Sequence, residues 1–460
     1  MSGSRIPRTL GLTDLVLLGT VAIVNVNTVP PVAGFGRATL ALWGLAFAAF
    51  FVPEAIAVLA LSRRYPGEGG VYLWARRHFG DVHGFVSGWC YWTNNVFYVP
   101  TVVLYLVGIS VYVAGPQAAS LADNHAFAAA VSLSLLWVLV ALNVLGVGVG
   151  KWVNNLGGIG TALAAGALIG LALLVSRTQG VSLSAADFRV AEADWRLISS
   201  FGVICFALVG LELGSVMGDE VRDPERTIPV AVAWGGALSG ILYLGATLAV
   251  LAALPQQEIG VVQGILQAVS RMAEASGLGA LVPALALVLS ISIAGIASAW
   301  LGGSARVPFV AGLDAYLPPA LGRLHPRFAT PYVALITHGV LSSLFVAMSF
   351  VGATVKEAYL TLLELAVVLQ LLPFLYLYAA LIRLPGRTAP ERLRFRPTTL
   401  RFAGVCGLAT TALGMVVAFV PSRQVTSVWL FELKMLVGTG FFLGLAGLFF
   451  VTSRARRART

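Results

Sequence analysis

A carboxylate, Glu212, lies in an apolar segment of the chain between two glycines. The segment, residues 201–229, reads FGVICFALVGLELGSVMGDEVRDPERTIP, and Gly210 and Gly214 flank the glutamate. A hydrocarbon core tolerates irregular backbone or a charge only where protein or a water-lined cavity surrounds it. The pattern therefore predicts a broken membrane helix with a binding site at its break, near the middle of the membrane. The alternative is a kinked structural helix in which Glu212 is paired with a neighbour.

A second apolar run, residues 15–36, has the same kind of interruption. It contains polar residues followed by prolines, namely Asn25, Asn27, Thr28, Pro30 and Pro31. Because proline removes a backbone donor and disfavours helix in the residue before it, we expect the chain to unwind near 25–31. The two broken helices would be the first and the sixth, five helices apart and entering the membrane from opposite sides. That placement is expected of an inverted repeat of five plus five helices.

The elements that must position these breaks are membrane helices. Hydrophobic residues make up 58% of the 460 residues and charged residues 11%, too few charges for the surface of a soluble protein. Apolar runs long enough to span a bilayer recur along the chain. We predict twelve spans, at about 11–34, 39–62, 84–113, 126–147, 152–176, 197–218, 230–253, 281–303, 331–351, 358–383, 400–420 and 429–451. A β-barrel is excluded because its strands would alternate polar and apolar residues.

The basic residues predict how the chain is oriented. With a cytoplasmic N-terminus, most of the 30 lysines and arginines fall in inner segments, so both termini are expected in the cytoplasm. We expect a multi-pass protein of the cytoplasmic (inner) membrane, whose +10 charge faces anionic lipid rather than nucleic acid. No connection is long enough for a soluble domain, so 1–460 is predicted to be one transmembrane domain. Its repeat core would span 11–383, and 400–451 would add helices eleven and twelve.

Four segments, in this order, resemble the amino acid–polyamine–organocation transporters, and in particular the basic amino acid/polyamine-type permeases. They read RYPGEGGVYLWARRHFG, FALVGLELGSVMGDEVRDPERTIP, RVPFVAGLDAYLPPALGRLHPRFATP and LLPFLYLYAAL. Together with the first span they cover most of residues 10–385. The resemblance implies an all-α membrane protein with a leucine-transporter-type fold. It also implies discontinuous helices 1 and 6 and alternating access around a central site.

The resemblance implies substrate contacts at both breaks. The first group would bind an anionic group through free amides and polar side chains, and consists of Asn25, Val26, Asn27 and Thr28. This stretch departs from the Gly-Ser-Gly pattern of the family. The second group would face an ammonium group with backbone carbonyls, and consists of Ala207, Leu208 and Val209. Beside it, Phe206 corresponds to the aromatic residue that closes over the substrate; the alternative for Phe206 is plain core packing.

Two carboxylates are predicted to act in gating or proton coupling. Glu212 corresponds to the glutamate that links protonation to helix movement in the family. Glu54 follows Pro53 in a PEA motif that resembles the polyamine-type branch. Loading and releasing a proton during the transport cycle is a role that a buried carboxylate can fulfil.

Other polar residues of the spans complete the expected substrate site. Asn94 and Tyr98 would form polar walls, Ser298 would contribute a hydroxyl, and Glu364 would favour a cationic or amine-bearing substrate. The alternatives are that the asparagines join packed helices and that Glu364 pairs with a neighbouring helix.

These observations predict a secondary transporter of amino acids or related amines, working as a proton symporter or an exchanger. The sequence has no nucleotide-binding loop and no nucleophile–base constellation, and its five histidines lack metal-ligand spacing. We therefore expect no enzyme activity, no cofactor and no metal, with a small-molecule substrate, lipid, and a proton or counter-substrate as partners. The alternatives are a polyamine or organocation transporter, and a non-transporting membrane sensor or complex subunit.

Overall fold

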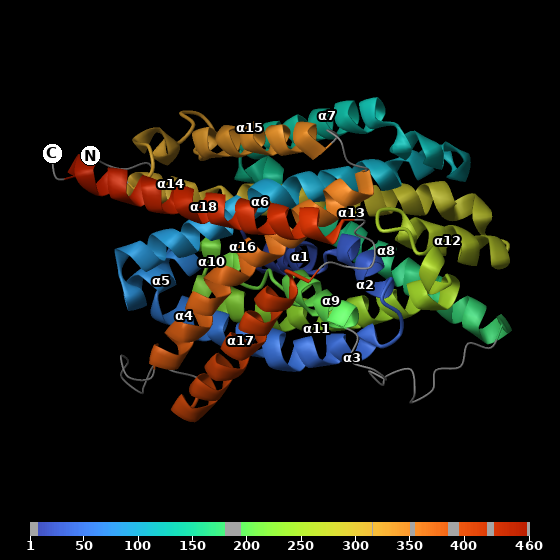
Figure 1. The fold of residues 1–460 in the computed structure, drawn as a ribbon, viewed down its shortest axis with the longest axis horizontal. Coiled ribbons are helices and arrows are strands. Elements are labelled where there is room, and N and C mark those ends of the chain that lie inside the picture. Colours follow the sequence, from blue (N-terminus) through green and yellow to red (C-terminus); the bar gives the residue numbers. More distant parts are fainter. Residues whose placement is uncertain are drawn as a thin grey trace.

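The computed structural model describes residues 8–179, 195–314, 316–349, 355–384, 395–420 and 427–457. Within these ranges every regular element is a helix, apart from one isolated β-bridge between Leu10 and Val221. Figure 1 shows the helices packed lengthwise into one bundle. Ten of the described helices are long and apolar enough to cross a membrane.

Among the described residues, nine α-helices precede the break near Gly210. They are α1 (Leu12–Ile23), α2 (Val29–Ala33), α3 (Thr39–Ala46), α4 (Val52–Arg64), α5 (Val71–Phe79), α6 (Asp81–Ser110), α7 (His125–Val144), α8 (Val147–Gln179) and α9 (Trp195–Ala207). The second half forms α10 (Leu213–Val216), α11 (Pro224–Ala253), α12 (Gly264–Ala275), α13 (Val282–Ser304), α14 (Arg306–Leu313), α15 (Tyr332–Ser349), α16 (Val355–Arg383), α17 (Pro397–Val417) and α18 (Val428–Arg457).

Two of the twelve predicted spans are not among the ten long helices. The predicted sixth span is divided between α9 and α10, so neither piece is long enough to cross a bilayer. The predicted ninth span corresponds to α15, whose apolar part, Tyr332–Ala347, is shorter than a full span. Part of that predicted span, 350–351, lies outside the described residues.

The first broken helix has its break slightly earlier than the prolines. Val24 and Asn25 leave helical geometry, with ψ near 75° at both, and a 3₁₀ turn, η1 (Val26–Thr28), follows. The prolines then lie in the first turn of α2, where a missing N–H removes no helical hydrogen bond. The predicted unwinding near 25–31 is therefore confirmed for its first half. Its second half is wrong, because Pro30 and Pro31 start a helix.

The sixth helix is broken as predicted near Gly210. Residues 208–212 separate α9 from α10, and Gly210 adopts a φ of +142° that side chains with a Cβ rarely adopt. Gly214, by contrast, lies inside α10, where a Cβ would come within 2.9 Å of Leu15 of α1. Gly210 thus permits the break, and Gly214 permits close packing.

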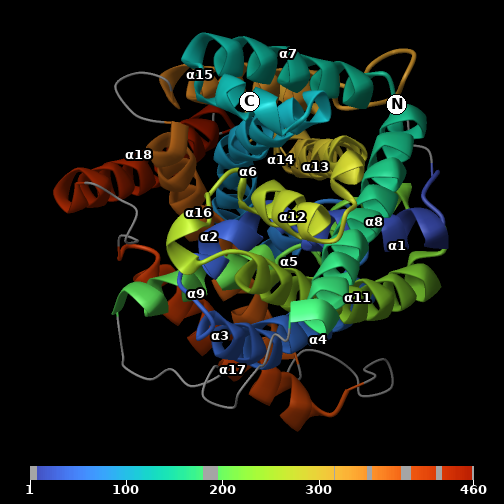
Figure 2. The same ribbon diagram turned by 90° about the vertical axis from the view of Figure 1, so that its right-hand side faces the viewer.

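The core is organised around α6 and α1. Helix α6 packs against α16, α13 and α5, and from Gly84 to Ile109 nearly all of its residues are buried. Helix α1 packs between α11, α8 and α13. Figure 2 shows the short helix α12 beside α8. Its apolar side, including Ile265, Leu266 and Val269, is buried.

Candidate substrate and proton site

The breaks of the first and sixth helices lie against each other. A Cβ added to Gly210 would come within 3.0 Å of the carbonyl group of Ala22 and 3.1 Å of Ile23. No residue other than glycine fits this approach without movement of α1. The two stretches of non-helical backbone, from segments almost 190 residues apart in the chain, therefore form one site.

A tyrosine that sequence reasoning missed joins the two breaks. The hydroxyl of Tyr243, in α11, accepts a hydrogen bond from the backbone N–H of Asn25 at 2.7 Å. The same hydroxyl lies 2.5 Å from the carbonyl oxygen of Ile23 and 2.6 Å from that of Ala207, and can donate to one of them at a time. Tyr243 thus satisfies backbone groups that the breaks leave without helical partners. No sequence signal identified it, because it is one aromatic residue within an apolar span.

Three aromatic rings form a wall beside the breaks. Phe206 lies edge-on to Tyr98, with ring centroids 5.0 Å apart, and Tyr98 lies edge-on to Trp300 at 6.1 Å. The indole N–H of Trp300 donates to the carbonyl oxygen of Ala22 at 3.2 Å, and the Tyr98 hydroxyl lies 3.5 Å from Oδ1 of Asn27. Trp300, in α13, is a second residue that the sequence reasoning did not select.

Glu212 caps the start of α10 and is fully buried. Its Oε1 accepts a hydrogen bond from the Tyr91 hydroxyl of α6 at 2.9 Å, and its Oε2 accepts one from the backbone N–H of Gly210 at 2.9 Å. No ion pair in the described part of the chain includes Glu212. The neighbours that pair with Glu212 are therefore hydrogen-bond donors rather than a cation.

A second carboxyl group, that of Glu54, lies beside Glu212. Glu54 is fully buried, and its carboxyl faces Glu212 and the backbone amides of Gly210 and Leu211. Neither of its oxygens has a well-formed hydrogen bond to a described residue. The sequence predicted the roles of these two residues separately, and the tertiary structure brings their side chains together.

A π-helical segment precedes Glu54. Residues Phe47–Phe51 form one wide turn between α3 and α4 (η2), and such turns insert an extra residue that leaves backbone groups out of register. The carbonyl oxygen of Phe50 accepts a hydrogen bond from the hydroxyl of Tyr378 in α16, at 2.9 Å. The wide turn therefore rotates the start of α4, where Glu54 lies, relative to α3.

The remaining predicted site residues contact other groups of the bundle. The Thr28 hydroxyl donates to the carbonyl oxygen of Asn25 at 2.7 Å, and the carbonyl oxygen of Ala207 lies 2.6 Å from the Tyr243 hydroxyl. Asn94 bonds Gln370 of α16, and Ser298 accepts a hydrogen bond from Asn143 of α7 at 3.0 Å.

Glu364, in α16, is buried, and its Oε2 has no hydrogen-bond partner among the described residues. No described contact joins Glu364, Asn94 or Ser298 to the two breaks. The residues at the breaks and on their aromatic wall are at most 5% exposed, and consist of Asn25, Val26, Asn27, Thr28, Tyr98, Phe206, Ala207, Leu208, Val209 and Trp300. The site is therefore closed in this structure.

A different arrangement of charges lies where α4 ends and α14 begins. Arg306 forms an ion pair with Glu220 at 2.8 Å, and both side chains are buried. Glu68, in the loop after α4, lies beside them. Burial and the negative charge of Glu220 raise the pKa of Glu68 to about 8, and the positive charge of Arg306 opposes that shift. We refer to Glu68, Glu220 and Arg306 as the ion-pair cluster.

The N-terminal segment is attached to this cluster through its backbone. The N–H of Leu10 donates to the carbonyl oxygen of Glu220 at 3.0 Å, and the carbonyl of Leu10 accepts from Arg222 at 2.8 Å. The loop before α5 is held equally closely, because the N–H of Gly69 donates to the carbonyl oxygen of Val216 at 3.0 Å. This end of the bundle is thus closed by both charge and backbone contacts.

Comparison with known proteins identifies the family. The sequence profile of the amino acid permease family matches residues 10–442. A transporter of uncharacterized function from Legionella pneumophila is 26% identical over 453 residues, which cover 96% of each chain. The probable agmatine/putrescine antiporter AguD of Lactococcus lactis is 22% identical over 88% of this chain and 85% of its own length. The cadaverine/lysine antiporter of Escherichia coli is 26% identical over 75% of this chain and 77% of its own length. This chain therefore belongs to the amino acid permease family and is a secondary transporter of amino acids or amines, not an enzyme.

Proposed function

We propose that this permease carries amine-bearing substrates by alternating access and that a proton held between Glu54 and Glu212 drives its conformational cycle. The observation that carries the proposal is the contact between these two buried carboxyl groups at the break of the sixth helix. Two carboxylates in a buried site repel each other strongly, and one shared proton turns their contact into a hydrogen bond. Loss of that proton would favour separation of the α4 and α10 segments.

The surroundings of the pair support a proton rather than a metal cation. The groups facing it are the Tyr91 hydroxyl and the amides of Gly210 and Leu211, which are donors to negative oxygen. Donors of this kind stabilise a carboxylate, whereas a bound cation would need additional oxygen ligands. The thiol of Cys205 and the phenol of Tyr378 lie in the same region.

The proposed substrates carry an amine. The names of two relatives specify agmatine, putrescine, cadaverine and lysine, all of which carry cationic nitrogen. In this chain, the backbone carbonyls of residues 207–209 and the buried carboxyl of Glu364 are acceptors that suit an ammonium group. An amide side chain at the first break, such as that of Asn27, suits a substrate carboxylate. We propose residues 25–28, 206–209, Asn94, Tyr98, Ser298 and Glu364 as the substrate site.

The proposal includes the finer architecture. Ten of twelve spans would form a five-plus-five inverted repeat over 11–383. The last two spans, at 400–451, would be added to it, and the whole of 1–460 would be one domain. The protein would lie in the cytoplasmic membrane with both termini inside, where the basic loops meet anionic lipid headgroups.

Transport by purified protein in proteoliposomes tests this function. We expect saturable uptake of labelled lysine or putrescine that is accelerated by an imposed pH gradient. Glu212→Gln should retain exchange of internal for external substrate but lose acceleration by the gradient, because the amide cannot release a proton. Equal acceleration in Glu212→Gln would overturn the proton role, and absence of any flux would leave a sensor or a complex subunit as the better assignment.

A transporter restricted to polyamines is the second candidate. Buried Glu364 favours it, because one of its oxygens has no hydrogen-bond partner among the described residues and a second carboxylate suits a second ammonium group. Competition experiments separate a transporter of both amino acids and amines from one restricted to polyamines. Putrescine and spermidine should block lysine uptake if the protein transports both classes. In the restricted one they should be transported while lysine neither competes nor enters. Glu364→Gln should weaken diamine binding more than lysine binding.

A further inference from the structure

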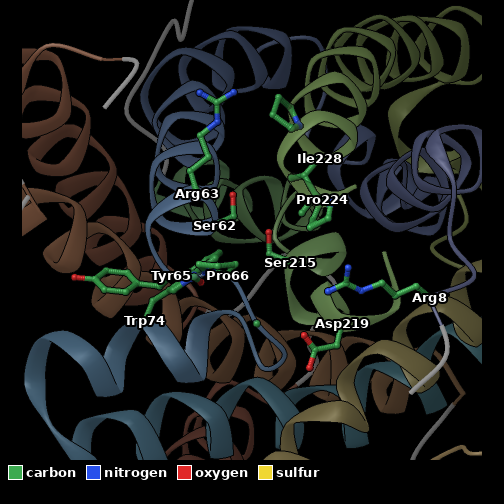
Figure 3. A pocket seen from close by; sticks show the side chains of 12 residues that line it. Arg8, Ser62, Arg63, Tyr65, Pro66, Trp74, Ser215, Asp219, Pro224 and Ile228 are labelled. Carbon is green, nitrogen blue, oxygen red and sulfur yellow. The ribbon is translucent and has the colours of Figure 1, made fainter. Parts of the chain in front are cut away.

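A cavity of about 240 Å³ opens beside α10, on the side of the bundle formed by the end of α4 and the start of α11 (Figure 3). A water molecule occupies roughly 30 Å³, so the space suits a small organic ion rather than a single water. The cavity is lined by none of the residues that form the proposed substrate site or the carboxyl pair. It is therefore a separate feature of the fold.

The lining brings together basic and hydroxyl groups from three segments. Arg8 comes from the extended N-terminal segment, Ser62 and Arg63 come from the last turn of α4, and Ser215 comes from α10. In Figure 3 the side chain of Arg8 extends toward Ser215 and Asp219, and Arg63 stands at the opposite rim. Neither arginine forms an ion pair with an acidic residue in the described ranges. Asp219 is the acidic member of the lining, and it is exposed.

The hydroxyl of Ser215 provides an independent indication of a ligand. Ser215 is 3% exposed, and its Oγ has no hydrogen-bond partner among the described residues. A buried hydroxyl without a partner is costly, and native structures usually supply one. Because Ser215 lines the cavity, a ligand oxygen there would accept its hydrogen bond.

The long helix α11 adds to the positive potential. Pro224 and Ile228, from its first two turns, form part of the wall, so the N-terminal end of its dipole faces the cavity. Arginine side chains, hydroxyl donors and a helix N-terminus are the groups that bind phosphate in proteins. Basic pockets between membrane helices bind phosphate headgroups of lipids in the same way.

We propose that this cavity binds a phosphate group through Arg8, Ser62, Arg63 and Ser215. The phosphate comes from an anionic lipid headgroup or from a soluble phosphate. Bound there, it joins α10 to the end of α4 and to the N-terminal segment. Since α10 begins directly after Glu212, a ligand bound to α10 also holds the Glu212 carboxyl in the position seen in this structure. It thereby slows the transport cycle. This effect on transport rests on the proposed function, whereas the binding itself does not.

Thermal unfolding of the full-length protein in nanodiscs tests the binding without any transport measurement. One arm titrates inorganic phosphate into phosphatidylcholine discs, with chloride at equal ionic strength as control. The other arm replaces phosphatidylcholine by phosphatidylglycerol without added phosphate. A rise of Tm in the first arm identifies a soluble phosphate as sufficient, and a rise in the second arm alone identifies a lipid headgroup.

Variants of the lining connect the effect to this cavity. Arg8→Gln combined with Arg63→Gln should weaken the apparent affinity at least about tenfold, because charge-assisted hydrogen bonds are lost. Ser215→Ala should weaken it by roughly threefold to tenfold. Arg323→Gln, the same charge change at an exposed arginine outside the lining, should bind as the wild type does.

Two results would overturn the proposal. One is a Tm that responds to neither phosphate nor phosphatidylglycerol. The other is a response that the Arg8/Arg63 double variant and Arg323→Gln share, which would place binding elsewhere. If the double variant fails to fold, the single variant Arg63→Gln is compared with Arg323→Gln instead. Arg63 is partly exposed and makes no ion pair with a described residue, so this variant should fold. If the protein binds phosphate through these residues but transports nothing, the proposed transport function is refuted and the proposed phosphate site is still supported.

Discussion

Two buried groups of carboxylates in this permease are compensated in different ways. At the break of the sixth helix, Glu54 faces Glu212 with hydroxyl and amide donors around them, and no described residue forms an ion pair with either carboxyl group. In the ion-pair cluster, Glu220 is paired with Arg306 at 2.8 Å, and Glu68 lies beside them. Both groups connect segments that are far apart in the chain.

The difference shows how one fold can contain a movable contact and a fixed one. An arginine keeps its charge at every physiological pH, so the Arg306–Glu220 pair holds its segments together permanently once it is formed. A contact between two carboxyl groups exists only while a proton is present, so it can be made and broken in each cycle. The following variants test this comparison, in order of decreasing effect on stability.

Removal of the arginine should have the largest effect. Arg306→Met is expected to lower the free energy of unfolding by about 3–5 kcal/mol, because Glu220 would remain buried without a cation. Chemical unfolding in detergent measures it. The double variant Arg306→Met/Glu220→Gln should recover most of the loss. A double variant as unstable as the single one would show that the pair is not held by charge.

Glu68 should contribute to the pH dependence of stability. Its pKa is about 8 in the folded protein and about 4.3 in an unfolded chain. Between these values the folded state keeps a proton that the unfolded state has released, so raising the pH favours unfolding. The stability is expected to fall by about 2–4 kcal/mol from pH 5 to 8 and to level off above it.

Glu68→Gln provides the control for this prediction, because glutamine cannot titrate. Thermal scans from pH 5 to 9 should show a clearly smaller fall of Tm in the variant than in the wild type. Parallel profiles for the two proteins would assign the pH dependence to other groups.

Loss of the Tyr243 hydroxyl should have an intermediate effect. Tyr243→Phe removes the bonds that join Asn25 and Ala207 across the two breaks, which is expected to cost about 1–2 kcal/mol. Tyr376→Phe, a half-buried tyrosine on α16, is the matched control and should cost less. Substrate affinity, measured by thermal shift, should drop only in the Tyr243 variant.

Neutralising the carboxyl pair should change stability least. Glu54→Gln keeps a donor facing Glu212, so the free energy of unfolding should change by less than about 1 kcal/mol. Proton-driven uptake in proteoliposomes should nevertheless be lost, while substrate exchange persists. A strongly unstable Glu54→Gln would indicate that this contact, like the ion-pair cluster, is structural.

The sequence predicted the breaks better than the contacts across them. Gly210, the asparagines at 25 and 27 and the carboxylate at 212 stand out because each is exceptional within an apolar run. The prediction placed Pro30 and Pro31 in the break, whereas they lie in the first turn of α2. Proline is compatible with the first turn of a helix as well as with a break, so the sequence alone did not separate the two. Tyr243 and Trp300 carry no such signal, since aromatic residues are ordinary members of membrane spans.

The resemblance to a known family predicted an amine or amino acid permease, and the sequence by itself determined many membrane helices with a carboxylate at a break. Composition and local pattern are sufficient for this, because a bilayer permits few backbone arrangements and few buried charges. Only the tertiary structure decided that Glu54 meets Glu212, that Tyr243 joins the two breaks, and that Arg306 compensates Glu220. These contacts depend on which faces of separate helices pack together, and the spacing of residues along one chain does not specify that.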